Sequence, residues 1–406
     1  MIQITDSEST VKLHTSSPAE QDLYVALSYC WDDTQPVQTT KDTIETYKRA
    51  IEICTLPQTI KDAISATKAL GYKSLWVDAL CIVQDDDEDK SREISQMHKI
   101  YENAILTISA ASARKAIEGF LRKFSPATFP VSMFCWRSHD WFTTFKLDYR
   151  CPDGNTCQLS LTSTFEASPI NEPINERAWT LQEALLSPRM LMYGRLGMFW
   201  RCRSSFETTH DQITWRLWQS NGLLFSLSEP LPVDGIAEEP SHSRVVYMYT
   251  FGNNLYNKWM KLVSLYSSRQ LSNRHDKLPA IGGIAMKIHA ETGVKYIAGL
   301  WEDSMLAGLS WQRALSAHPV RRSHTPTFGD HSSWRAPTWS WASIDGPVEY
   351  TTYDIHWQSM DPRAHVHRAV AEPRSNSTAF QHLWHAEMHI EGWLKEVEIE
   401  SIPAAM

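Results

Sequence analysis

The segment that decides the fold runs from residue 56 to residue 111, LPQTIKDAISATKALGYKSLWVDALCIVQDDDEDKSREISQMHKIYENAILTISAA. Its hydrophobic pattern predicts a helix, a strand at 74–80, a second helix at 91–103 and a strand at 104–110. A further short apolar strand is predicted just upstream, at 23–28. Strands alternating with helices indicate the α/β class, with a parallel sheet and flanking helices. Because ligands bind outside the carboxyl ends of such strands, we expect a site there.

Local signals set the ends of the predicted helices. We expect Thr55 to cap the first helix, with Pro57 in its first turn and Gly71 just after its end. The acidic run 85–89 precedes the second helix, where negative charge complements the helix dipole.

Composition narrows the class of protein. The chain has 406 residues, 42% hydrophobic and 21% charged, which is typical of a globular protein large enough for two domains. A net charge of −8 argues against a nucleic-acid partner. No apolar run approaches the ~20 residues that span a bilayer, so no membrane partner is expected. Seven scattered cysteines without Cys-x-x-Cys spacing suit a reducing, cytoplasmic setting. The 17 tryptophans fill a core or offer stacking surfaces.

Along the chain we expect three regions. Residues 1–22 form a loose lead-in, and 23–203 form the α/β domain, with an irregular insertion at about 120–175. Residues 204–406 form a mixed helical and β region packed on that core.

Five blocks of sequence, in one order and spacing, resemble the fungal HET (heterokaryon incompatibility) domain family: LSYCW at 27–31, LPQTIKDAI at 56–64, LWVDALCIVQDD at 75–86, SREISQMHKIYENAILTISAASA at 91–113 and NERAWTLQEALLSPRML at 175–191. The resemblance implies a core like that of TIR (Toll/interleukin-1 receptor) domains, a flavodoxin-like parallel sheet. It also implies a role in fungal non-self recognition and cell death. Since some TIR domains hydrolyse NAD at the nicotinamide–ribose bond, NAD is the substrate that this resemblance suggests, with no further cofactor.

Two positions depart from the family pattern. Asp32 stands where the family has Gly after Cys-Trp, and Val83 stands where it has Asn. Gly permits close approach of a backbone to a ligand, whereas a carboxylate adds charge and bulk. Either the activity is lost or the site has adapted to another substrate.

Four residues are candidates for catalysis. Glu93 is the first choice for a carboxylate that stabilises an oxocarbenium-like transition state; the alternative is a first-turn Glu favoured by the helix dipole. Asp78 has three alternative roles: it takes part in catalysis, it pairs with Arg177, or it caps a loop amide. Cys81 is a nucleophile or a small buried residue. Asp32 would be an acid or base in a different reaction.

Further residues are predicted to bind a small-molecule substrate because they lie in the same loops or on the helix that begins at RAWTLQEALL: Ser28, Tyr29, Cys30, Trp31, Gln84, Arg177, Trp179, Gln182 and Glu183. That helix forms one wall of the site or serves only in packing. His382, His385 and His389 have helical-looking spacing in a segment that favours strand, so we expect no metal site.

Three functions follow as hypotheses. The first is a TIR-like NAD glycohydrolase with Glu93 as its carboxylate. The second is a HET scaffold recruited to specialised metabolism as a cyclase, isomerase or lyase. The third is a non-enzymatic signalling module that assembles, for example as a homo-oligomer.

Overall fold

The computed structural model describes residues 1–5, 7–15, 22–31, 37–121, 144–150, 156–162, 172–195, 197–202, 206–208, 255–314, 334–350, 364–374 and 377–393. The chain divides into two compact units. The first unit comprises Met1–His242, Arg269–Asn273 and Pro279–Lys287, and the second comprises the remaining segments.

The first unit is built on a nine-stranded sheet of order β11-β10-β9-β6-β3-β5-β1-β2-β4. Its strands are β1 (Ile2–Ile4), β2 (Thr10–Leu13), β3 (Val25–Ser28), β4 (Ile51–Glu52), β5 (Ser74–Trp76), β6 (Leu106–Ser109), β9 (Arg189–Gly194), β10 (Gly197–Cys202) and β11 (Phe206–Thr208). The predicted α/β class is confirmed, but only the central strands β5, β3, β6 and β9 pair in parallel. The strands on both sides of them are antiparallel.

Residues 1–22, which we expected to form a loose lead-in, supply two strands of this sheet. β1 pairs with β5, placing Ile2 opposite Leu75, and β2 pairs with β1. The reason is the alternation of apolar residues in both segments: Ile2, Ile4, Val11 and Leu13 are buried while the residues between them are not.

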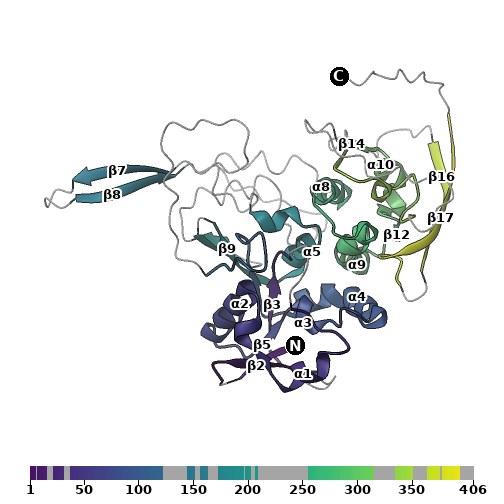
Figure 1. Ribbon diagram of the computed structural model, residues 1–406. Helices are drawn as coiled ribbons and strands as arrows, with labels where there is room; N and C mark the ends of the chain where they lie inside the picture. The colour runs from purple at the N-terminus through teal and green to yellow at the C-terminus, as the bar shows by residue number, and fades with distance from the viewer. Residues whose placement is uncertain are drawn as a thin grey trace, which may run out of the picture. The chain divides into compact units, whose positions relative to one another are not determined.

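Helices cover both faces of the central strands (Figure 1). α2 (Gln58–Ala69) connects β3 to β5, and α3 (Asp78–Cys81) with α4 (Asp87–Asn103) connects β5 to β6. Figure 1 shows α2 on one side of β3 and α4 on the other. The buried residues of α2, which include Ile60, Ala63 and Ile64, follow the predicted helical spacing.

Three predicted boundaries need correction. The strand expected over 74–80 ends at Trp76, and Asp78 begins a helical turn in which its carboxylate accepts the N–H of Ala79. Pro57 rather than Thr55 occupies the N-cap of α2. The helix expected from residue 91 begins at Asp87, because the Asp86 side chain accepts the N–H groups of Glu88 and Asp89 and caps it.

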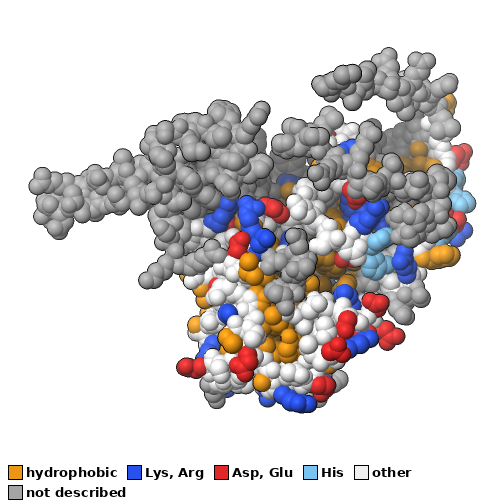
Figure 2. Space-filling model, in the orientation of Figure 1, with side chains coloured by type: hydrophobic (Ala, Val, Ile, Leu, Met, Phe, Trp, Pro, Cys, Tyr) orange, Lys and Arg blue, Asp and Glu red, His pale blue; other side chains and the backbone are white. Residues whose placement is uncertain are grey.

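The acidic run ahead of α4 therefore has a structural role. Asp86 caps the helix, and the carboxylate of Asp89 accepts the backbone N–H of Val83 at 2.8 Å. Asp85 accepts the N–H of Lys41 at 2.8 Å. Acidic side chains are visible on the surface over α4 in Figure 2.

The insertion predicted at about 120–175 contains a hairpin. Its strands are β7 (Thr144–Arg150) and β8 (Thr156–Thr162), which pair in antiparallel register. Residues 122–143 and 163–171 lie outside the described part of the chain.

The second unit has an aromatic core. It contains α8 (Leu255–Ser267), the end of α9 (Pro279–Thr292) and small two-stranded sheets: β12 (Tyr296–Ile297) with β13 (Leu300–Trp301), β14 (Trp311–Arg313) with β15 (Val348–Tyr350), and β16 (Ala364–Pro373) with β17 (Leu383–Gly392). Trp259, Trp301 and Trp341 are buried, and the indole N–H groups of Trp259 and Trp341 both donate to the carbonyl of Gly299. These three tryptophans are core residues, which is one of the two roles that the sequence analysis expected for tryptophan.

Candidate functional site

Polar side chains gather where β3 and β5 end. Ser28 is the last residue of β3, Tyr29, Cys30 and Trp31 follow it, and Asp78 lies two residues beyond β5. Parallel pairing of Val25 with Leu75 and Ala26 with Trp76 brings both carboxyl ends to one edge of the sheet. The four parallel strands have the order second-first-third-fourth along the chain. In doubly wound sheets of this order, ligands bind where the winding direction changes, here beside β3.

Asp78 is the most richly contacted carboxylate at this edge. It accepts the indole N–H of Trp31 at 2.9 Å, the backbone N–H of Ala79 at 2.7 Å and the hydroxyl of Tyr29. Burial raises the pKa of Asp78, and the positive charge of Arg177 and these hydrogen bonds offset part of that rise. The residue nevertheless keeps an intermediate exposure. A carboxylate that is both held and accessible can contact a ligand.

Glu183, on α5 (Trp179–Leu186), is the second carboxylate of the cluster, and it is only 4% exposed. The hydroxyls of Ser28 and Tyr101 are its hydrogen-bond partners. Burial raises its pKa to about 7, although the bond from Ser28 and the charge of Arg177 lower it, while Asp78 adds to the rise. At neutral pH, Glu183 is therefore divided between its protonated and ionised forms.

The positive charge of Arg177 acts on both carboxylates, Asp78 and Glu183. It precedes α5, and its guanidinium donates to the backbone carbonyl of Tyr29 at 2.5 Å. Its charge lowers the pKa of Asp78 and of Glu183. The sequence alternatives for Asp78, an attraction to Arg177 or the capping of a loop amide, both occur here.

Tyr101, on α4, belongs to the cluster, although the sequence analysis did not name it among the site residues. Its hydroxyl donates to the carbonyl of Leu27 at 3.0 Å and also reaches Glu183. Its ring packs edge-on against Trp76 at 5.6 Å between centroids. A buried tyrosine hydroxyl requires a polar partner, which is the sequence signal that could have revealed it.

We use the name "carboxylate cluster" for Ser28, Tyr29, Trp31, Asp78, Tyr101, Arg177 and Glu183. Five of the nine predicted binding residues are in it, together with one predicted catalytic residue.

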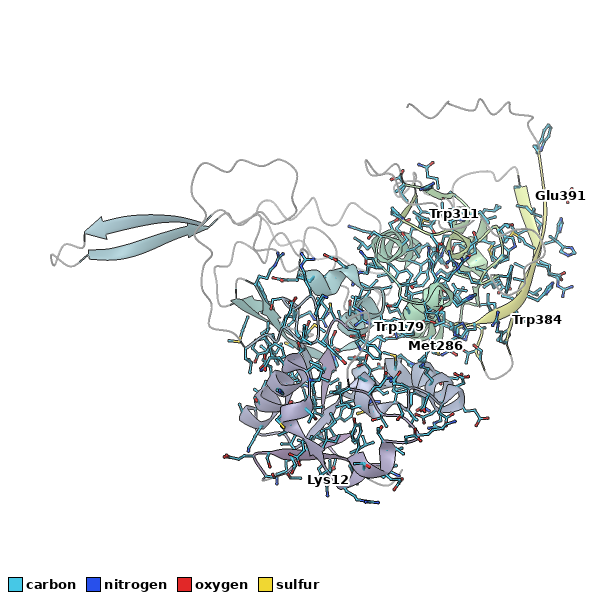
Figure 3. The ribbon with its side chains drawn as sticks, in the orientation of Figure 1. Lys12, Trp179, Met286, Trp311, Trp384 and Glu391 are labelled. Atoms are coloured by element: carbon cyan, nitrogen blue, oxygen red, sulfur yellow. The ribbon has the colours of Figure 1, made fainter. Side chains whose placement is uncertain are left out.

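The side chains of Gln84 and Gln182 form hydrogen bonds with backbone groups of neighbouring segments. The Gln84 amide donates to the carbonyls of Asp78 at 3.1 Å and Ile82 at 3.3 Å, so it shapes the loop that holds Asp78. Gln182 is buried and accepts the backbone N–H of Gly283, on α9, at 3.2 Å. Trp179 begins α5 and is half-buried; Figure 3 labels it.

The two predicted cysteines lie close to the cluster. Cys30 is buried, and burial raises the pKa of its thiol to about 11, so it is protonated at neutral pH. The Cys81 sulfur accepts the backbone N–H of Val77 at 3.4 Å and packs against the core. Both thiols lie against core residues, and a nucleophilic role for Cys81 stays a prediction.

Glu93 lies on α4 and has a different set of neighbours. Burial raises its pKa first and the nearby Asp89 adds to the rise, while Arg92 and the chain's amino terminus lower it. The Arg92 guanidinium lies 3.6 Å from the Glu93 carboxylate. No cluster residue is among these groups, so its catalytic role stays a prediction. Asp32, the fourth catalytic candidate, lies outside the described residues.

Metal-binding geometry is absent from the described part of the chain. In those residues no group of three or more His, Cys, Asp or Glu side chains is placed to hold a metal ion. His385 and His389 lie on β17, a strand, as the local sequence suggested. Among the described helices, none combines the length and apolar character needed to cross a membrane.

Comparison with known proteins bears directly on the region that carries the cluster. The family model described as "Heterokaryon incompatibility protein (HET)" matches residues 24–183, which contain every residue of the carboxylate cluster. Residues 24–183 are thus similar to the HET family. A similar protein is "Heterokaryon incompatibility protein 6, OR allele" of Neurospora crassa, 29% identical over 99 residues. That match covers 23% of this chain and 15% of the relative, so the two share one segment. No solved structure matches the chain.

The region that is similar to the HET family thus brings together blocks of sequence that are far apart. Residues 28–31 and 78 come from the two neighbouring strand ends, and 177 and 183 come from α5 and the residue pair before it. Four of the five blocks, at 27–31, 75–86, 91–113 and 175–191, each contribute residues to the carboxylate cluster.

Proposed function

We propose that this protein acts in fungal heterokaryon incompatibility, and that its HET domain hydrolyses the nicotinamide–ribose bond of NAD at the carboxylate cluster. The first part follows from the family and from the name of the Neurospora relative. The second part rests on one observation: two carboxylates with raised pKa values, Asp78 and Glu183, share one guanidinium at the ligand-binding edge of a doubly wound sheet.

The chemistry fits an accessible, held carboxylate. In the reaction the C–N bond to ribose breaks, its electron pair leaves with nicotinamide, and positive charge builds on the ribose. The Asp78 carboxylate would stabilise that charge, as carboxylates do in glycoside hydrolysis. Water then adds to the ribose and loses a proton to solvent, giving ADP-ribose. Trp31 and Tyr29, which orient the carboxylate, also offer rings next to it.

Glu183 is suited to a positioning role rather than to contact with substrate. It is buried, and its carboxylate fixes the hydroxyls of Ser28 and Tyr101. Both acids have raised pKa values, but Asp78 keeps an intermediate exposure whereas Glu183 is buried, and this difference suits them to different tasks.

The test is a chromatographic assay of nicotinamide released from NAD by the full chain and by Asp78→Asn. Asparagine keeps the shape of the side chain but removes its charge. We expect release by the wild type and a loss of at least about 100-fold in the variant, the scale of a lost electrostatic contact to a transition state. Wild-type protein that releases no nicotinamide would contradict the proposal and favour metabolite chemistry or non-enzymatic assembly.

A further inference from the structure

We propose that the second unit binds a small phosphate-bearing anion at a basic cluster formed by Arg274, His275, Lys277, Arg335 and Arg374, which lies outside the HET domain. This site is separate from the carboxylate cluster and goes beyond the proposed hydrolysis of NAD. It rests on how these side chains are placed and on which charges oppose them.

Arg335 is the centre of the basic cluster, and its side chain is only 4% exposed. Its guanidinium donates to the carbonyl of Ala342 at 2.7 Å and to that of Arg274 at 3.3 Å, and it pairs with Asp345 at 2.5 Å. Among the described residues, its remaining nitrogen, Nη2, has no hydrogen-bond acceptor. A buried donor of this kind is costly unless a ligand or water accepts from it.

Lys277 adds a second buried cation beside Arg335. Its ammonium donates to the carbonyl of Ile344 and lies 5.9 Å from the centre of the Trp341 ring. Burial lowers the pKa of Lys277 to about 7, and the charge of Arg335 lowers it further while Asp345 acts in the opposite direction. A bound anion would favour the charged form of this lysine.

The basic charge extends outward from these buried residues. Arg274 and His275 are half-buried on the turn η4 (Arg274–Lys277), and Arg374 is exposed. After burial, the charges of Arg274, Arg374 and Arg335 all lower the pKa of His275, so each of the three guanidinium groups is within electrostatic reach of this histidine. The pKa of His382 is also lowered, first by burial and then by the charges of Arg374 and His275.

The Lys and Arg side chains of the basic cluster outnumber the carboxylates that act on them. Arg274, Arg335 and Arg374 act on the pKa values of its members, whereas Asp345 is the carboxylate named among the main influences on Lys277 and Arg335. Guanidinium groups pair with phosphate through two parallel hydrogen bonds, which makes them the usual recognition groups for it. Because the innermost donors are buried, only a small group such as a terminal phosphate would reach them.

The test is calorimetric titration of the full chain with inorganic phosphate and with pyrophosphate, against sodium chloride at equal ionic strength. We expect saturable binding that weakens at least about tenfold in Arg374→Gln, since a charge-assisted hydrogen bond contributes about that factor or more. Lys295→Gln is the matched control: it removes one exposed charge of the second unit that pairs with Glu302. We expect it to leave phosphate affinity unchanged.

Arg335→Lys provides a second variant that keeps the buried charge and removes the fork of donors. We expect weaker phosphate binding with an unchanged fold by circular dichroism. Absence of saturable binding by the wild type, or equal losses in Arg374→Gln and Lys295→Gln, would overturn the proposal. Asp78→Asn should bind phosphate like the wild type, so this result is independent of the NAD assay.

Discussion

At the scale of single residues, the carboxylate cluster is organised around Glu183. A carboxylate this deeply buried would be costly if it had no partners, yet two hydroxyls and a nearby guanidinium serve it. Burial that these groups do not offset raises the pKa of Glu183 to about 7. The protein keeps an acid whose protonation changes across the neutral range, beside a second acid, Asp78, that is better supported by hydrogen bonds.

Glu183 should make the stability of the protein fall as pH rises. Its folded-state pKa, about 7, lies above its ordinary value of 4.5, so between these pH values the folded chain binds more protons than the unfolded chain. The stabilisation is present below pH 4.5 and is lost as pH rises toward 7. The loss is up to about 3 kcal/mol for this shift. Urea unfolding at pH 5 and pH 8 measures it.

The variant Glu183→Gln isolates this effect. We expect its free energy of unfolding to change less between pH 5 and pH 8 than that of the wild type, by about 3 kcal/mol at most. Parallel pH profiles for the two proteins would show that Glu183 has an ordinary pKa in the folded chain.

Cys30 should be a poor nucleophile despite its place beside the cluster. Its thiol is buried, and a pKa of about 11 leaves almost no thiolate at pH 7.5. We expect iodoacetamide to modify Cys54, which is exposed, much faster than Cys30 in the folded protein. Peptide mass spectrometry over time gives both rates, and rapid labelling of Cys30 before unfolding would contradict this account.

At the scale of elements, three helices of the first unit meet at Gly283. A Cβ atom added there would lie 2.5 Å from the Cβ of His98, on α4, and 2.8 Å from the Gln182 carboxamide, on α5. Lys287, one turn further along α9, pairs with Glu102 of α4. This close approach fixes α5, and therefore Arg177 and Glu183, relative to α4 and Tyr101.

Gly283→Ala should consequently destabilise the protein. In an exposed helix the same change is stabilising by up to about 1 kcal/mol. Here we expect a loss of about 1–3 kcal/mol, because the added methyl group overlaps helix α4. Thermal unfolding of the full chain measures the sign, and a higher melting temperature in the variant would show that the helices do not pack this closely.

Element boundaries show what the sequence could and could not predict. The stripe of α2, the left-handed Gly71 and the strands β3, β5 and β6 follow from local pattern. The end of β5 was placed too late, because Val77, Ala79 and Leu80 continue the apolar run, while the Asp78 carboxylate accepts the N–H of Ala79 and begins a helical turn. Side-chain-to-backbone hydrogen bonds of this kind leave no periodic signal.

At the scale of the whole molecule, the sequence predicted the α/β class and the edge where the cluster lies. It did not predict the strands β1 and β2, because segments of three or four residues carry too few alternations to distinguish a strand from a polar terminus. Nor could it place Glu183 beside Asp78, 105 positions away in the sequence, although Asp78 was a candidate for catalysis and Glu183 a candidate for substrate binding. Such proximity depends on tertiary packing of α5.

Two exposed tryptophans distinguish the second unit from the buried aromatic residues of its core. Trp384 and Trp393 are 66% and 87% exposed, and Figure 3 shows Trp384 and Glu391 at opposite ends of β17. Tryptophan content alone therefore did not separate core residues from surface residues in this chain.

The most direct test of the central claim, that the reactive carboxylate belongs to the carboxylate cluster, compares Asp78→Asn with Glu93→Gln in the nicotinamide-release assay. Both substitutions neutralise one carboxylate, and circular dichroism confirms that each variant is folded. We predict that Asp78→Asn loses nicotinamide release while Glu93→Gln keeps most of it. The reverse result, loss in Glu93→Gln and retention in Asp78→Asn, would place the chemistry on α4 and contradict the account.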